Sequence, residues 1–412
     1  MSTDQTQVTS LPYAGIRVIE FTHMVMGPTC GMVLGDLGAE VIKIEPMDGD
    51  KTRGLLGSGA GFFSMFNRNK KSMAVNINTP EGRKIVQELI ATADILCENF
   101  KPGTMKKLQL DYASLKVQFP RLIYVSHKGF LPGPYDHRTA LDEVVQMMGG
   151  LAYMTGTEEK PLRAGASVND MMGGIFGAMG AMAALRQRDL TGQGQEIQSA
   201  LFENNVLLVG QHMMQYAVTG KPAKPMPSRI SAWGIYDVFE VAQAEKIFLA
   251  VVSDTQWKIF CDIFNWPDLF QNTRYATNNQ RVQSRETLIP LIKARLKSYS
   301  AQRISQLFAD HGLPYAAITR PEQLFDDPHL NATGGLAKII ISDGPKAGQE
   351  VTTPLLPITM DGKRLPIRFN PPKTGEHSNT ILAELGYSFE EIQELLAKQT
   401  IRIEKQGDKN DL

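Results

Sequence analysis

Short apolar segments alternate with helical patterns over the first half of the chain, and this alternation constrains the fold more than any other feature. The predicted order is strand 17–21, helix 30–37, strand 40–45, helix 80–91, strand 95–98, helix 113–119, strand 122–126 and strand 196–201. Parallel strands need a crossover connection, and a helix usually provides it. The sequence therefore predicts an α/β fold with a large, doubly wound parallel sheet.

The length of the chain predicts a second domain, because 412 residues are more than one hydrophobic core ordinarily contains. The proline-rich segment 220–227 is predicted to be a linker. The later elements are strands 235–239 and 247–252, helices 256–264 and 285–296, strands 339–341 and 351–353, and a helix opened by a capping box from Ser388 to Glu391. We predict a large domain from residues 1–220 and 330–412, with a smaller α+β domain, 226–328, inserted between them.

Composition excludes several classes of partner. Lys+Arg and Asp+Glu balance at 43 each, so we expect neither nucleic acid nor an anionic membrane surface as a partner. The longest apolar run, 171–185, is shorter than the roughly 20 residues that span a bilayer. Residues 1–10 are polar and carry no secretory segment. The three cysteines form no C-x-x-C pair, so we expect a cytoplasmic protein without a disulfide framework or a metal site.

One stretch, residues 165–185, combines a lone carboxylate with an apolar run rich in glycine. Asp170 is predicted to be the N-cap of a helix that ends near residues 186–188. Each glycine inside that helix costs about 1 kcal/mol relative to alanine, which indicates that another helix or a ligand approaches the backbone closely. Two interpretations remain open from this stretch alone. It is a capped, tightly packed core helix, or Asp170 is a catalytic carboxylate in a desolvated pocket.

Polar loops follow three of the predicted strands, at residues 22–29, 98–103 and 126–130. Because parallel strands end at one edge of a sheet, these loops are expected at the edge where ligands bind in such folds. Loops of this composition are also routine turns, so both interpretations remain open. The turn at Gly27 and Pro28 is not a G-x-G-x-x-G motif, and no dinucleotide site is predicted.

Taken together, several segments resemble the class III coenzyme A transferases (CaiB/BaiF type), the family of formyl-CoA:oxalate and carnitine CoA-transferases. The matching segments are 15–22, 27–28, 34–45, 69–72, 98–103, 142–146, Asp170 and 192–195. Their order and spacing are specific as a set, and they cover nearly the whole chain. The resemblance implies an interlocked homodimer, in which each chain has a large CoA-binding α/β domain and a small inserted one.

The resemblance also implies a reaction, the movement of CoA from an acyl-CoA donor to a small carboxylic acid. Asp170 matches the family's nucleophile, and Asp142 matches a second acidic residue that supports it. The carboxylate would give a mixed anhydride and then an aspartyl-CoA thioester, which the acceptor acid opens. Such a pocket must exclude water, and the N-terminus of the following helix is expected to hold negative charge there.

Coenzyme A enters as a substrate, and no permanently bound cofactor is expected. By resemblance, the residues that contact it are Met24, Val25, Val75, Asn76, Asn78, Asn99, Phe100, Lys101 and Lys107. The sequence departs from formyl-CoA transferases at Pro46 and Thr139, where those enzymes carry arginine and lysine. Residues 228–234 also replace their glycine-rich lid. Small dicarboxylates with succinyl-CoA as donor are therefore preferred over oxalate, and Arg163, Arg229 and His212 are candidate contacts to a second carboxylate.

Two other functions compete with CoA transfer. An α-methylacyl-CoA racemase needs an acid and a base on opposite faces of the α-carbon, usually with a histidine just before residue 142. That position is Leu141 here, and the nearest histidine is His137. A non-catalytic acyl-CoA-binding protein is the second alternative, and covalent trapping on Asp170 would distinguish it from a transferase.

Overall fold

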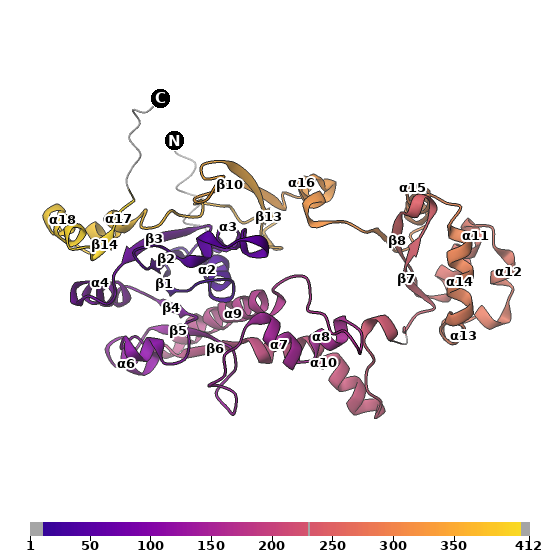
Figure 1. Ribbon diagram of the computed structural model, residues 1–412, viewed down its shortest axis with the longest axis horizontal. Helices are drawn as coiled ribbons and strands as arrows, with labels where there is room; N and C mark the ends of the chain where they lie inside the picture. The colour runs from indigo at the N-terminus through magenta and orange to yellow at the C-terminus, as the bar shows by residue number, and fades with distance from the viewer. Residues whose placement is uncertain (1–10, 230, 405–412) are drawn as a thin grey trace. The chain divides into compact units, whose positions relative to one another are not determined.

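The computed structural model describes residues 11–229 and 231–404 (Figure 1). This part of the chain divides into two compact units. One unit joins the described residues up to Ala223 to those from His329 onward, and the other is Lys224–Pro328. Within the described ranges, no helix is both long and apolar enough to cross a bilayer. The polar segment 1–10 and Ile230, which belongs to segment 228–234, lie outside the described residues.

A seven-stranded sheet forms the centre of the first unit. Its strands are β1 (Arg17–Phe21), β2 (Glu40–Glu45), β3 (Lys70–Val75), β4 (Ile95–Glu98), β5 (Ile123–Lys128), β6 (Glu196–Ala200) and β14 (Ile401–Arg402). The order across the sheet is β14-β3-β2-β1-β4-β5-β6, and every pairing is parallel except that of β14 with β3. The predicted parallel sheet is confirmed, together with the positions of β1, β2, β4, β5 and β6.

Strand β3 is absent from the sequence predictions because it begins with two lysines. The Lys70 side chain is fully buried, and its ammonium group donates to Glu20 Oε1 at 2.8 Å and to the Pro28 carbonyl at 3.0 Å. Ion pairing and hydrogen bonding offset the cost of burying such a charge. Hydrophobic periodicity cannot reveal a strand whose buried side chain is a paired lysine.

Helices cover both faces of this sheet (Figure 1). On one face of the sheet, α2 (Met26–Asp36) and α9 (Val168–Thr191) pack on strand residues such as Val18, Val41 and Val125. The alternate strand residues, such as Ile19 and Ile42, point into a second core. The helices of that core are α4 (Pro80–Ala91), α6 (Tyr112–Gln118), α17 (Ser378–Glu384) and α18 (Phe389–Ala397).

Further helices and two hairpins belong to the first unit, except that Pro328 at the start of α16 falls in the second. They are α3 (Phe62–Phe66), α5 (Thr104–Lys107), α7 (Asp142–Met148), α8 (Leu151–Thr155), α10 (Leu201–Thr219), α16 (Pro328–Ala332) and the hairpins β10 (Leu336–Ile340) with β11 (Glu350–Pro354) and β12 (Thr359–Met360) with β13 (Lys363–Arg364). The predicted capping box is confirmed, because Ser388 Oγ accepts from the Glu391 amide while the Glu391 carboxylate accepts from the Ser388 amide. The strands predicted near 339–341 and 351–353 are β10 and β11.

The second unit has a three-stranded antiparallel sheet and its own helices. The strands are β7 (Ile235–Glu240), β8 (Lys246–Val251) and β9 (Tyr315–Ala317), and the helices are α11 (Asp254–Ile263), α12 (Pro267–Phe270), α13 (Asn278–Gln283), α14 (Arg285–Leu296) and α15 (Ala301–Asp310). Its core is separate and aromatic, centred on Trp257, Phe260 and Phe308. Helix α10, which precedes it in the chain, ends at Gly220 in the left-handed conformation.

Two of the three cysteines meet inside the first unit. Cys30 of α2 and Cys97 of β4 are fully buried with their Sγ atoms 3.8 Å apart, and they are not linked. Cys261 belongs to the second unit and is also a free, buried thiol. The structure therefore contains thiols that pack as small apolar groups rather than a disulfide framework.

Strands β1 and β4 are neighbours at the point where the strand order reverses, since β2 and β3 lie beyond β1 and β5 and β6 lie beyond β4. Phe21 at the end of β1 pairs with Glu98 at the end of β4, which pairs in turn with Ser126 of β5. The loops that follow these strands therefore share one edge of the sheet, as predicted. In open α/β sheets this is the edge at which ligands bind.

Candidate functional site

The loops after β1 and β4 are joined by the side chain of Asn99. Its Oδ1 accepts from the His23 amide at 3.0 Å, and its Nδ2 donates to the His23 carbonyl at 2.8 Å. The Phe100 ring stacks on the His23 ring with centroids 5.9 Å apart. Two of the predicted coenzyme A contacts, Asn99 and Phe100, thus hold the edge of the sheet together.

The two predicted contacts in the first loop differ in accessibility. Met24 is 39% exposed, has a φ of 62°, and donates its amide to Thr52 Oγ1 at 2.9 Å. Val25 is 1% exposed and its side chain packs in the core beneath α2. Val25 as a whole is therefore enclosed, and its carbonyl accepts from Thr29, whereas Met24 offers its side chain to a ligand.

A hollow of about 210 Å³ lies beside Phe100 and brings together four of the predicted contacts. Its walls are mainly apolar and consist of Phe21, Ile44, Glu45, Pro46, Met47, Val75, Asn76, Ile77, Asn78, Phe100 and Leu108. Pro46 closes the end of β2 at the place where formyl-CoA transferases are expected to carry arginine. The hollow suits a flat, largely apolar group whose polar edge can meet the Asn76 and Asn78 side chains.

The predicted cationic contacts, Lys101 and Lys107, lie on the segment that follows β4. Both side chains are exposed, and neither forms an ion pair with another residue of the described chain. Exposed ammonium groups of this kind can meet phosphate groups at little desolvation cost. They lie in sequence next to Phe100 and Leu108, which line the hollow.

Asp170 lies in the first turn of α9, and the N-cap prediction for it is wrong. Helix α9 begins at Val168, so Ser167 occupies the N-cap position and its side chain makes no capping hydrogen bond. The cap comes instead from another helix. Asp142 Oδ2 accepts from the amides of Asn169 at 2.8 Å and Asp170 at 3.1 Å.

This cap changes what the N-terminus of α9 can do. The amides of Val168 and Met171 donate to the carbonyls of Ala166 and Ser167, and the next two amides donate to Asp142. The first-turn N–H groups that were expected to hold a departing oxyanion are therefore already occupied by partners within the chain. The helix dipole still favours negative charge at Asp170.

The carboxylate of Asp170 lies in an electrostatically unusual place. Burial raises its pKa to about 7, the negative charge of Asp142 adds to the rise, and the charges of Arg163 and His127 oppose it. Asp142 is itself 7% exposed, and its Oδ1 accepts from Gln146 Nε2 at 2.5 Å. Asp142 and Asp170 are thus neighbouring carboxyl groups in different surroundings. In enzymes, such a difference allows two carboxyl groups to act in different chemical roles.

The glycines of α9 allow close contact with α2 and the sheet. A Cβ atom at Gly174 would lie 2.4 Å from the Met26 carbonyl oxygen, and one at Gly177 would lie 2.4 Å from His127 Nε2. The prediction that something approaches this backbone closely is confirmed, and the neighbours are α2 and β5. Residues four apart share a helix face, so Asp170 faces the start of α2 just as Gly174 does.

The three candidate contacts to a second carboxylate lie in different parts of the structure. Arg163 points toward the acidic residues of α7, with its guanidinium nitrogens 3.9 Å from Asp142 Oδ1 and 3.6 Å from Glu143 Oε2. His212 is half-buried in the middle of α10, and Arg229 belongs to the second unit and donates to the Met226 carbonyl. Arg163 alone is brought beside Asp142 and Asp170.

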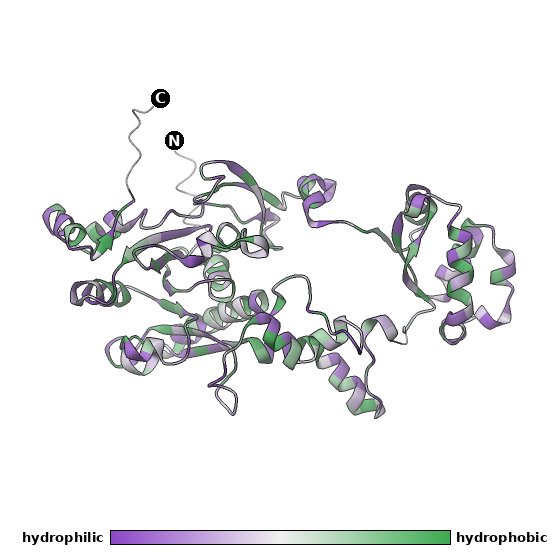
Figure 2. Ribbon diagram, in the orientation of Figure 1, coloured by the Kyte–Doolittle hydropathy of each residue, from purple (hydrophilic) through white to green (hydrophobic). Residues whose placement is uncertain are grey.

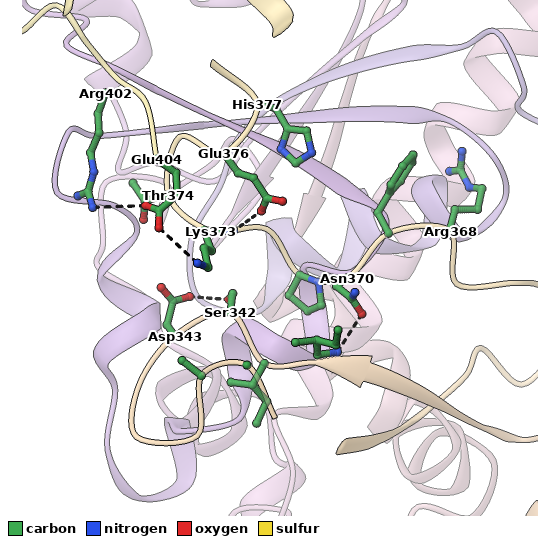
Figure 3. Close-up of a pocket in the computed structure, with 16 residues that line it drawn as sticks. Ser342, Asp343, Arg368, Asn370, Lys373, Thr374, Glu376, His377, Arg402 and Glu404 are labelled. Atoms are coloured by element: carbon green, nitrogen blue, oxygen red, sulfur yellow. Dashed lines mark hydrogen bonds and ion pairs between the residues drawn. The ribbon is translucent and has the colours of Figure 1, made fainter. Parts of the chain in front are cut away.

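A larger hollow of about 660 Å³ lies elsewhere, along the segment that leads to β14 (Figure 3). Several of its charged side chains already have partners: Lys373 Nζ is 3.4 Å from Glu404 Oε1, Arg402 lies near the same carboxylate, and Asp343 pairs with Arg53. None of the predicted site residues lines this hollow. Size alone therefore does not identify the functional edge of the sheet.

Sequence reasoning missed one buried polar residue of this site, Gln146. It is completely buried, and its side chain connects Asp142 to the backbone of Ala164. Its position four residues after Asp142 on one helix could have revealed the contact, because residues at this spacing face the same side. A single glutamine on an apolar helix face belongs to no specific motif. Its spacing from Asp142 was therefore the one sequence feature that could indicate the contact.

The chain is similar to known proteins over most of its length. Residues 13–378 match the family described as CoA-transferase family III. The chain is 33% identical over 389 residues to a succinate–glutarate CoA-transferase of Agrobacterium fabrum, covering 91% of this chain and 96% of the relative. It is 32% identical over 398 residues to a succinyl-CoA:glutarate CoA-transferase of Mus musculus, covering 95% and 90%. The crystal structure of a CaiB/BaiF family protein from Brucella suis superposes with a TM-score of 0.80 at 33% identity, covering 91% and 99%.

Proposed function

Because the chain belongs to CoA-transferase family III and is an enzyme of this class, we propose that it moves CoA between two carboxylic acids through covalent intermediates on Asp170. The observation that carries the proposal is the position of this carboxylate. It is held in the first turn of α9 beside the start of α2, in surroundings that raise its pKa to about 7. A desolvated carboxylate is a better nucleophile than one in water.

The proposed reaction has four steps. The ionised Asp170 attacks the acyl-CoA carbonyl and expels CoA thiolate, which leaves a mixed anhydride. The thiolate attacks the Asp170 carbonyl of this anhydride, releases the donor acid and forms an aspartyl-CoA thioester. The acceptor carboxylate then attacks the thioester and again expels thiolate, which finally attacks the acceptor carbonyl. The products are the new acyl-CoA and free Asp170, and no step consumes water or a redox partner.

Coenzyme A is proposed to bind along the shared edge of the sheet, as a substrate and not as a resident cofactor. The 210 Å³ hollow would take the adenine, with Phe100 as one wall and Asn76 and Asn78 at its polar side. Lys101 and Lys107 would meet the phosphates, and Met24 would contact the pantetheine arm, with the enclosed Val25 supporting the loop from below. The support is the convergence of these residues on one edge.

The acids are proposed to be small dicarboxylates, with succinyl-CoA as donor. The relatives named above are described as acting on succinyl-CoA or succinate and glutarate. Arg163 supports the same choice, because its guanidinium lies beside Asp142 at 3.9 Å and beside the neighbouring Glu143 at 3.6 Å. These loose pairs leave donors for a second substrate carboxylate.

The assembly is proposed to be an interlocked homodimer in the cytoplasm. Large apolar side chains are exposed along α9 and α10, where Figure 2 shows green bands. They are Ile175, Met179, Leu207, Leu208, Met213, Met214, Tyr216 and Val218. Contiguous exposed apolar surface marks an interaction site. The free thiols of Cys30, Cys97 and Cys261 support a reducing compartment.

The test combines a donor–acceptor matrix with trapping of the intermediate. Acyl-CoAs are mixed with carboxylic acids and the new CoA esters are identified by mass spectrometry, while hydroxylamine or borohydride traps the adduct on Asp170. A transferase gives new CoA esters and a label on residue 170. A binding protein gives neither, and a racemase exchanges the α-proton without label. Racemase is disfavoured here because Leu141, which is 63% exposed, stands where the histidine is needed.

A further inference from the structure

The side chain of Gln146 connects three segments of the proposed active site. Its Nε2 donates to Asp142 Oδ1 at 2.5 Å, and its Oε1 accepts from the Ala164 amide at 2.8 Å. The residue is fully buried, so no water replaces either contact when it is lost. A buried amide with its donor and acceptor both used fixes the two groups that it joins.

Asp142 connects Gln146 to the first turn of α9, which carries Asp170. Its Oδ1 is held by Gln146, and its Oδ2 accepts from the amides of Asn169 and Asp170. Helix α9 has no side-chain cap of its own, so its first turn depends on this carboxylate. The chain of contacts thus runs from Ala164 through Gln146 and Asp142 to the backbone of Asp170.

We propose that Gln146 is a positioning residue for the reaction: its amide holds the Asp142 side chain as the cap of α9 and thereby fixes the place of Asp170. It touches no reacting atom and acts only through Asp142. The inference rests on the proposed function. The charged groups around Asp142 and Asp170 are Arg163 of the segment after α8, Glu143 of α7, which pairs with Arg163, and His127 of β5, whose charge acts on Asp170.

The donor and acceptor pattern makes the test specific. In Gln146→Glu, one carboxyl oxygen can still accept from the Ala164 amide. The other oxygen takes the place of the NH₂ group that donates to Asp142 in the parent. Protonated, the new acid donates as the amide did; ionised, it repels Asp142. The ratio of variant to parent transfer rate is expected to fall about tenfold or more between about pH 5.5 and pH 8.5.

Asp142→Asn produces the opposite mismatch. The asparagine oxygen can accept from the first turn of α9, but its NH₂ group then faces the Gln146 donor. Transfer is expected to fall by about tenfold, the size of one lost buried hydrogen bond. In the double variant Asp142→Asn with Gln146→Glu, the NH₂ group of the new asparagine donates to the new glutamate, whose carboxylate also accepts from Ala164. The chain of hydrogen bonds from Ala164 to α9 is restored, while the negative charge moves from residue 142 to residue 146 and the long Arg163–Asp142 pair is lost. The rate is therefore expected to recover severalfold from the single variants without reaching that of the parent.

Hydrogen exchange provides a readout that does not depend on activity. The amides of Asn169 and Asp170 are protected by Asp142, so a peptide spanning this turn should exchange about tenfold faster in either single variant and recover in the double variant. Gln187→Glu is the matched control, because it makes the same chemical change at an exposed residue of α9 whose side chain accepts from Gln195. Its rate and exchange should match those of the parent.

The outcomes separate this inference from the proposed function. A pH-independent rate ratio for Gln146→Glu, or a folded double variant no better than its single variants, overturns the positioning role while Asp170 can still be labelled in the parent. A parent that transfers no CoA overturns the proposed function. Recovery of exchange protection in the double variant would then still support the contact chain.

Discussion

At the scale of single residues, the site places two carboxylates beside each other and treats them differently. Asp142 accepts three hydrogen bonds, two of them from backbone amides. Asp170 is the group whose pKa is raised to about 7, first by burial and then by the charge of its neighbour. The carboxylate that receives no hydrogen bond from the described residues is the one that we propose as the nucleophile.

This difference predicts how stability depends on pH. The folded-state pKa of Asp170 lies above its unfolded value, so the folded state holds the proton longer and loses stability as pH rises from about 4 to about 7. Asp170→Asn removes that loss, which is roughly 1.4 kcal/mol for each unit of pKa difference. The variant should therefore be more stable than the parent at pH 8 and similar at pH 4, while transfer is lost. Thermal unfolding across pH measures this; parallel stability curves for the two proteins would contradict it.

Arg163 predicts a split between acceptor acids. Arg163→Gln removes the proposed partner of the second carboxylate, so kcat/KM for a dicarboxylate such as glutarate should fall about 10- to 100-fold. A monocarboxylate of similar length lacks that carboxylate and should lose much less. Loss of this cation also raises the pKa of Asp170, because Arg163 opposes the rise. Steady-state rates at about pH 8.5, where Asp170 is ionised in both proteins, isolate the effect on the acid. Equal losses for both acids would remove Arg163 from acid recognition.

At the scale of elements, the packing of α9 on α2 predicts a contrast between two glycines. A Cβ at Gly174 would meet the Met26 carbonyl oxygen at 2.4 Å and Thr29 Cβ at 2.5 Å, whereas none of the described atoms lies within 4 Å of one at Gly210 of α10. Gly174→Ala should cost about 1–3 kcal/mol and slow transfer, because the start of α2 faces Asp170. Gly210→Ala should stabilise by about 0.4–1 kcal/mol. Denaturant unfolding of both variants measures the contrast, and a neutral Gly174→Ala would mean that the two helices separate easily.

The elements also show what sequence patterns can and cannot predict. Strands β1, β2 and β4 were predictable because each contains two adjacent apolar residues, 18–19, 41–42 and 95–96, although β1 and β2 also bury a charged side chain. Strand β3 was not, because Lys70 is buried through its pair with Glu20. The cap of α9 was misassigned because the capping carboxylate, Asp142, lies on α7 and is distant in sequence. In both cases a residue distant in sequence makes the contact that a local sequence pattern would otherwise indicate.

At the scale of the whole molecule, the second unit is expected to fold by itself. It contains its own sheet, five helices and an aromatic core of fully buried side chains. A fragment of residues 224–328 should unfold cooperatively and keep the near-ultraviolet signal of its buried tryptophans. Circular dichroism and thermal unfolding of this fragment test the expectation. A fragment without a cooperative transition would show that the unit depends on the rest of the chain.

The exposed faces of α9 and α10 predict the assembly state. In sedimentation experiments the parent should behave as a dimer at micromolar concentration, and Met214→Glu, at a side chain that is 61% exposed, should shift it toward monomer. Lys398→Glu, on α18's C-terminal side and exposed, is the matched control and should leave the dimer intact. A monomeric parent would contradict the prediction. The composition suggested no such surface, because exposure depends on the fold rather than on the apolar fraction.

Strand β14 is the edge strand of the sheet and pairs with β3, where Ile401 lies opposite Val75. During synthesis, β3 leaves the ribosome long before its partner does, and the intervening chain must first build the second unit. The open edge of β3 is then free to pair with strands of other nascent chains. Yield in cells should therefore depend on chaperones that shield this edge until Arg402 has emerged.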